Sequence, residues 1–194
     1  EYDGWTDQKW MKNRTKGFND PISIYEMNIG SWRELNERVE EVTNLPEQNE
    51  EGPFVHYGDI VDELIIHCKK YHFSHVEVMP LSEFPFDGSW GYQVSGFYST
   101  TSRYGTPLEL KEFVNKLHAA GIGVIMDFVP VHFVKDDYAL AYFDGTPLYE
   151  YAKHEDADSE WGTSNFDLWK ESVRSFLMSA ANYWLHEYHF DGLR

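Results

Sequence analysis

One short segment, residues 122–129, limits the folds that this chain can adopt. Its middle residues, Val124, Ile125 and Met126, are apolar without a break. A strand with one wet face alternates polar and apolar residues, whereas a strand that is apolar on both faces belongs to a parallel sheet covered on both sides. Parallel strands need long crossover connections, which are usually helices. The segment therefore predicts a parallel sheet whose strands are joined by helices.

Alternating strand and helix patterns surround this segment. Runs of β-branched and aromatic residues predict strands at residues 22–29, 75–79, 122–129 and 189–193. Apolar side chains at helix spacing predict helices at residues 59–72, 106–121 and 173–185. Asp59 is predicted to cap the first helix. The second helix has a predicted N-cap at Thr106, proline at its first position, Glu109 three residues after the cap and Gly121 at its end.

This order is a repeated strand–helix–strand unit, which builds either an open doubly wound sheet or a (β/α)8 barrel. No G-x-G-x-x-G follows the first strand, and this weakens the nucleotide-binding version of the open sheet. Long loops, residues 80–105 and 130–166, follow the second and third strands. In a barrel, loops in these places form the active-site face.

Charge and composition exclude several partners. Sixteen Lys and Arg against 33 Asp and Glu give a formal charge of -17, which repels nucleic acid and anionic membranes. No apolar run is long enough to span a bilayer. The single cysteine, Cys68, excludes an internal disulfide and suits a reducing compartment. We therefore predict a cytoplasmic protein that binds neither nucleic acid nor membrane.

Candidate site residues follow the ends of the predicted strands. Asp127 ends the apolar strand, where a carboxylate is costly to bury without a partner, and His132 comes five residues later. Arg194 ends the fourth strand, beside the third, so a bidentate Asp127–Arg194 pair is predicted at the barrel mouth. Taken alone, Asp127 and His132 are better explained by structural roles, and Arg194 could be a surface residue. Three successive strand ends that deliver polar residues to one face nevertheless favour a site. Glu26 and Glu77 lie within strands and are assigned structural roles.

The loop at residues 86–93 is a further candidate, because its aromatic residues Trp90 and Tyr92 are flanked by glycines. Such rings can lie flat against a ligand, although packing on neighbouring helices explains the composition equally well. Other clusters are weaker. The histidines at 67, 72 and 75 suit solvated or capping roles, and the acidic residues Glu155, Asp156, Asp158 and Glu160 lack the EF-hand pattern. No metal and no cofactor are predicted.

These motifs resemble the alpha-amylase superfamily and, within it, the 1,4-alpha-glucan branching enzymes. The resemblance covers nearly all of residues 21–194. Val131 precedes the histidine, where most amylases have Asn, and this favours the branching subgroup. The matching segments are residues 21–32, 90–93, 96–98, 101–107, 127–133, 161–163, 183–185 and 191–194.

The resemblance implies a partial (β/α)8 TIM barrel of about the first four βα units, since a full barrel needs roughly 250 residues. It implies that residues 1–20 are a linker from a missing N-terminal module. Residues 21–194 would be the N-terminal half of the catalytic barrel, truncated just before the nucleophile. No catalytic residue is expected within the chain, because the nucleophile lies two residues beyond Arg194 and the acid/base glutamate on a later strand.

The resemblance also implies roles in substrate binding. Tyr92 would stack against the sugar whose bond is broken, with Trp90 nearby, and His132 would hydrogen-bond the same sugar. Asp127 would orient Arg194, which would lower the pKa of the neighbouring nucleophile and hold it ionised.

The implied reaction is a retaining transfer that cuts alpha-1,4 glucan chains and re-attaches them through alpha-1,6 bonds, as in glycogen biosynthesis. Two alternatives stay open: a trehalose-forming or debranching hydrolase of the same superfamily, and a glucan-binding fragment without chemistry. The partner expected is an alpha-glucan. The isolated chain is expected to be inactive and to self-associate through open sheet edges.

Overall fold

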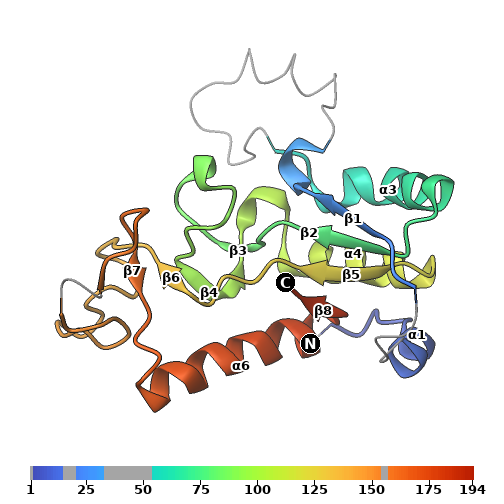
Figure 1. Ribbon diagram of the computed structural model, residues 1–194. Helices are drawn as coiled ribbons and strands as arrows, with labels where there is room; N and C mark the ends of the chain where they lie inside the picture. Colours follow the sequence, from blue (N-terminus) through green and yellow to red (C-terminus); the bar gives the residue numbers. More distant parts are fainter. Residues whose placement is uncertain (1, 15–20, 33–53, 154–156) are drawn as a thin grey trace, which may run out of the picture.

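Four parallel strands form the central sheet, as the sequence predicts. The computed structural model describes residues 2–14, 21–32, 54–153 and 157–194 (Figure 1). Every pairing in this sheet is parallel, and the strands lie side by side in chain order. They are β1 (Ile24–Met27), β2 (His75–Val78), β5 (Gly123–Met126) and β8 (Gly192–Leu193). The sheet is the α/β architecture of a partial (β/α)8 barrel.

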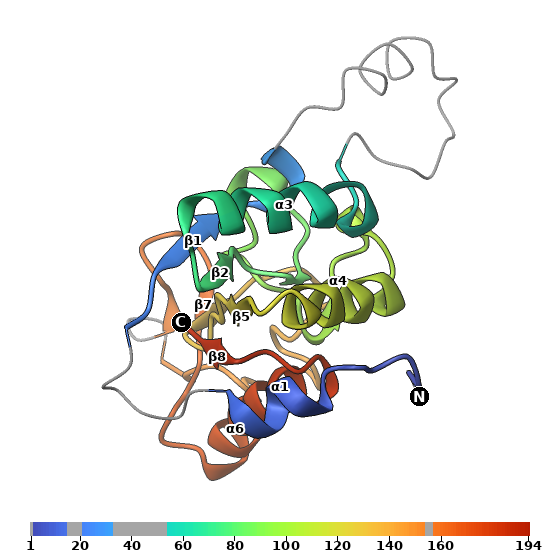
Figure 2. The ribbon, with the colours of Figure 1, turned by 90° about the vertical axis from the view of Figure 1, so that its right-hand side faces the viewer.

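The three predicted helices join these strands and cover the sheet. They are α3 (Tyr57–Tyr71), α4 (Pro107–Ala119) and α6 (Glu171–Glu187). Figure 2 shows α3 and α4 close together along one side of the sheet, with α6 below them. Their apolar faces meet the strands in one core cluster, which includes Leu64, Leu117, Val124 and Trp184. Each of these side chains is fully buried, as the helix and strand periodicities require.

The N-terminus of α4 confirms the predicted caps. Thr106 Oγ1 accepts a hydrogen bond from the Glu109 amide at 3.2 Å, and the Glu109 carboxylate accepts one from the Thr106 amide at 2.6 Å. Pro107 opens the helix, and Gly121 follows its end with a φ of +78°. The predicted helix boundary was correct because capping residues act within one turn of it.

The start of α3 was predicted less well. The helix begins at Tyr57 with His56 as the N-cap residue, so the prediction that Asp59 caps it was wrong. Asp59 instead occupies the third helical position, where its Oδ2 accepts a hydrogen bond from the His56 amide at 3.1 Å.

The two long loops contain short strand pairs that the sequence did not reveal. In the first loop β3 (Ser82–Glu83) pairs with β4 (Gly96–Thr100), and in the second β6 (His132–Phe133) pairs with β7 (Ser164–Asn165). Most of these strands have two residues, too few for a period-two pattern. A second apolar cluster, which includes Phe97, Phe133, Phe166 and Leu177, packs both loops onto α6.

The described residues 2–14 pack against the elements around the sheet. Helix α1 (Gln8–Asn13) lies at the edge of the fold away from the loop hairpins (Figure 1). Trp10 Nε1 donates to Asp191 Oδ1 at 2.9 Å, directly before β8. The Asp7 carboxylate lies 2.8 Å from Nδ1 of both His118 and His189. None of the helices in the described ranges has the length and hydrophobicity of a membrane span.

Candidate active site

The polar side chains of the sheet gather on one face near the strand ends. Parallel register places Glu26 beside Glu77, and Glu77 beside Ile125. Residues two apart on a strand point to the same side, so Asp127 continues this face one step beyond Ile125. The pairing of β5 with β8 brings Arg194 next to Asp127 in the same way. Local register alone therefore assembles three carboxylates and one guanidinium.

Asp127 is the centre of this group. It is 2% exposed, and both of its carboxylate oxygens lie close to Arg194 Nη1, at 2.9 and 2.7 Å. Tyr92 Oη donates a third hydrogen bond, at 2.5 Å. The predicted Asp127–Arg194 pair is thus present, but a single nitrogen serves both oxygens instead of the two-nitrogen fork of a bidentate pair.

The pair changes the protonation of its neighbours. Burial and the hydrogen bond to the Asp127 carboxylate raise the pKa of Tyr92 to about 12, so the hydroxyl stays a donor at neutral pH. The hydrogen bond to Asp127 also raises the pKa of Arg194 above its ordinary value. The guanidinium side chain is 56% exposed, so part of it remains available to other groups.

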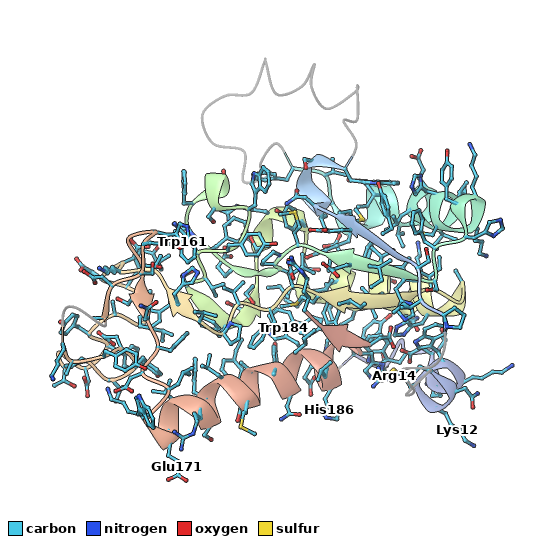
Figure 3. All side chains as sticks on the ribbon, viewed as in Figure 1. Lys12, Arg14, Trp161, Glu171, Trp184 and His186 are labelled. Atoms are coloured by element: carbon cyan, nitrogen blue, oxygen red, sulfur yellow. The ribbon has the colours of Figure 1, made fainter. Side chains whose placement is uncertain are left out.

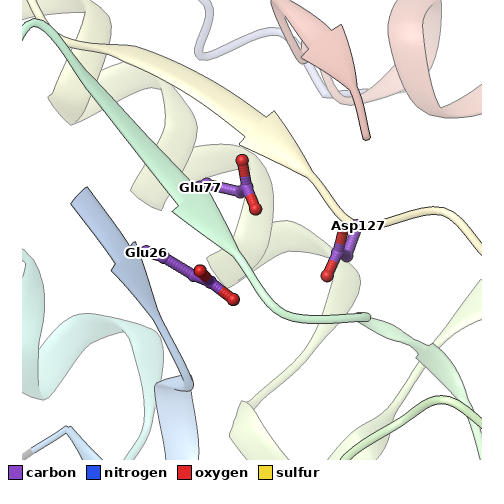
Figure 4. A group of neighbouring side chains, drawn as sticks. All are labelled: Glu26, Glu77 and Asp127. Atoms are coloured by element: carbon purple, nitrogen blue, oxygen red, sulfur yellow. The ribbon is translucent and has the colours of Figure 1, made fainter. Parts of the chain in front are cut away.

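A carboxylate cluster is formed by Glu26 of β1, Glu77 of β2 and Asp127, which directly follows β5 (Figure 4). Their oxygens lie within 4.8 Å of one another. Burial, followed by the charge of Asp127, raises the pKa of Glu77. Carboxylate oxygens at this spacing suit a hard cation, but Arg194 already brings a positive charge to two of them. The structural roles predicted for Glu26 and Glu77 overlooked this proximity.

A cavity of about 410 Å³ adjoins the ion pair and shares Tyr92 with it. Its lining residues are Phe86, Gly88, Ser89, Tyr92, Gln93, His132 and Trp161. The rings of His132 and Trp161 lie 5.5 Å apart, and His132 Nδ1 is 2.9 Å from Thr163 Oγ1. Aromatic walls with a few polar groups suit a ligand that has apolar faces and hydroxyl edges.

The structure brings Tyr92, Asp127, His132 and Arg194 together but leaves Trp90 apart. Trp90 is 63% exposed, and the cavity lining does not include it. Trp161 provides the second aromatic wall, and sequence reasoning did not assign it a role. Trp161 itself belongs to one of the matching segments, residues 161–163, and an aromatic residue in that segment was the available signal.

Two larger cavities lie elsewhere. One of about 620 Å³ is lined by α1 and by His118, and one of about 630 Å³ lies between the start of α4 and the end of α6. Neither is lined by Tyr92, whose hydroxyl donates to Asp127, whereas the cavity of about 410 Å³ is. The smaller cavity is therefore the one that adjoins the charged strand ends.

Known proteins have sequences similar to that of this chain. A family model described as "Alpha amylase, catalytic domain" matches residues 67–161. The 1,4-alpha-glucan branching enzyme GlgB of Fusobacterium nucleatum is 43% identical over 190 residues, and that of Geobacillus stearothermophilus is 47% identical over 193. Each alignment covers 98% of this chain but only 29% and 28% of the relative. The chain thus spans less than a third of the length of these relatives.

A solved structure supports the fold independently. The alpha-amylase from Geobacillus thermoleovorans, complexed with acarbose, superposes with a TM-score of 0.66. At 22% identity the superposition covers 89% of this chain and 39% of that one. A partial parallel barrel with an ion pair and an aromatic cavity at its strand ends is the framework of a (β/α)8-barrel enzyme. The chain is thus similar to the alpha-amylase superfamily in sequence and in fold.

The buried His132 makes stability depend on pH. Burial lowers the pKa of His132 from the ordinary 6.5, so the unfolded chain binds this proton more readily than the folded one. Stability contributed by the neutral ring is therefore lost as the pH falls through 6.5. We expect the free energy of unfolding to fall more steeply in wild type than in His132→Gln between about pH 7.5 and 5.5. Urea denaturation at each pH measures this, and equal slopes would contradict it.

Proposed function

We propose that the protein containing this chain is an alpha-glucan branching transglycosylase. It cuts an alpha-1,4 glucan chain and re-attaches the cut piece through an alpha-1,6 bond, the reaction that branches glycogen. One observation carries the proposal: the cavity of Tyr92 and His132 is joined, through the Tyr92 hydroxyl, to the Asp127–Arg194 pair. Similarity over 98% of the chain to proteins named 1,4-alpha-glucan branching enzyme favours branching over other chemistry of the superfamily.

The cavity suits one sugar ring. A pyranose ring has apolar C–H faces and hydroxyl edges, so the rings of Tyr92 and Trp161 offer flat contact surfaces. His132 lines the cavity, and since its Nδ1 lies 2.9 Å from Thr163 Oγ1, we assign its Nε2 to a sugar hydroxyl. In this proposal Trp90 contributes at most an outer contact.

Arg194 connects the cavity to the chemistry. A carboxylate beyond Arg194 attacks the anomeric carbon, the alpha-1,4 bond breaks, and the departing 4-oxygen takes a proton from a second carboxyl group. The 6-hydroxyl of another glucan then attacks the anomeric carbon of the glycosyl-enzyme, gives its proton to the second carboxylate and frees the first. Arg194, held by Asp127, lowers the pKa of the attacking carboxylate and keeps it ionised.

The proposal includes the organisation of the longer protein. Residues 21–194 supply the first half of the catalytic barrel, and residues 1–20 connect it to an N-terminal module. We further propose that the 194-residue chain alone is inactive and self-associates, since β1 and β8 each have one strand neighbour in the sheet. A cytoplasmic location is proposed from the lone Cys68 and from the glycogen-related reaction.

Product analysis of the complete protein tests the proposed reaction. Incubated with amylose, it should create alpha-1,6 bonds without creating reducing ends, because transfer replaces each broken bond with a new one. Proton NMR counts the alpha-1,6 bonds, and a reducing-sugar assay counts the free ends. A rise in reducing ends without new branches would replace branching by hydrolysis. Glucan binding without either product would leave only a binding role.

Two tryptophans provide a matched pair for the sugar site. Trp161→Ala removes a cavity wall and should weaken binding of a linear maltooligosaccharide about tenfold, an effect of about 1.4 kcal/mol. Trp90→Ala removes a ring of the same size outside the cavity lining and should change the affinity by less than about threefold. Isothermal titration calorimetry on the complete protein measures both. Equal losses in the two variants would contradict the assignment of the cavity.

A further inference from the structure

Glu77 is a buried carboxylate that the proposed reaction does not use. It lies in β2 and is 9% exposed, although the strand around it is apolar. Glu26 is the residue of β1 that pairs with Glu77 in the sheet register. Asp127 lies on the opposite side of Glu77, directly after the last residue of β5. The ion pair that Glu77 forms in the described part of the chain is with Arg194, whose Nε lies 3.4 Å from Glu77 Oε1.

The geometry of Arg194 gives this contact a role. Asp127 holds Arg194 through one corner of the guanidinium, Nη1, which lies near both carboxylate oxygens. A planar group held at one nitrogen can pivot about it, whereas contact at a second corner fixes its plane. We propose that Glu77 is a positioning residue: its carboxyl group holds Nε of Arg194 and thereby sets the plane of the guanidinium toward the reacting groups.

Charge explains why a buried glutamate is tolerated here. Three carboxylates lie within 4.8 Å of one another, but Arg194 provides one positive charge at the cluster. Burial and the charge of Asp127 raise the pKa of Glu77, and Arg194 opposes this more weakly. A protonated carboxyl group still presents its carbonyl oxygen to a donor, so the contact with Nε does not need a charged Glu77.

A positioning role for Glu77 predicts which of its substitutions disturb Arg194. Glu77→Gln keeps an acceptor oxygen at the same reach and should preserve the contact. Glu77→Met keeps the length of the side chain but offers Nε no comparable acceptor. Glu77→Asp keeps the carboxylate but withdraws it by one methylene group, and it provides the test if Glu77→Met does not fold. Glu171, exposed at the start of α6 and far from the site (Figure 3), supplies the control variants Glu171→Gln and Glu171→Met.

Three measurements on the complete protein distinguish this inference from the proposed function, on which its kinetic part rests. Crystal structures of the variants show the orientation of the Arg194 guanidinium whether or not the protein branches glucan. Steady-state assays on amylose give kcat, and calorimetry gives the Kd for a maltooligosaccharide. If wild type shows no turnover, the proposed function fails, while the crystal structures still test Glu77.

We expect the Arg194 guanidinium to leave its wild-type orientation in Glu77→Met and Glu77→Asp. In Glu77→Gln it should keep that orientation. Because misplacement of a catalytic group by about 1 Å can cost about a hundredfold, kcat should fall roughly 10- to 100-fold in the first two, with Kd unchanged. Glu77→Gln should stay within about threefold of wild type. An unmoved Arg194 in Glu77→Met or Glu77→Asp, or equal losses in all three variants, would overturn the inference.

Discussion

The buried carboxylate of Asp127 is the constraint on which the site depends. A carboxylate at the end of an apolar strand is unstable unless it is paired and hydrogen-bonded. Its partners come from distant parts of the chain: Tyr92 is 35 residues away in sequence, and Arg194 is 67 residues away. Satisfying this one group therefore ties together the loop after β2, the end of β5 and the end of β8.

The same strand that delivers Arg194 is held at its other end by a second buried carboxylate. Asp191, directly before β8, accepts from Trp10 Nε1 at 2.9 Å and from the Val124 amide at 2.7 Å, and it lies 2.9 Å from His118 Nε2. Strand β8 has only two residues, so its backbone pairing alone fixes it weakly. Polar contacts at both ends compensate, and the N-terminal helix thereby contributes to the placement of Arg194.

Much of this structure could be predicted from local patterns. The strand order, the caps of α4 and the Asp127–Arg194 pair follow from apolar runs, capping residues and strand-end positions, because each is determined within a few residues or by parallel register. Packing between distant segments could not be predicted. The docking of Trp10 against Asp191, the approach of Trp161 to His132 and the contact of Glu77 with Arg194 depend on how loops fold back over the sheet. No short sequence pattern encodes such contacts.

Because the cavity lies beside the charged strand ends, we propose that one sugar ring of an alpha-glucan binds between Tyr92 and Trp161, next to Arg194. A crystal structure of the complete protein with a linear alpha-1,4 glucan tests this claim most directly. We expect a sugar ring of the glucan against Tyr92, with one of its hydroxyl groups within hydrogen-bonding distance of His132. An ordered glucan bound only elsewhere, with the cavity of Tyr92 and His132 empty, would contradict it.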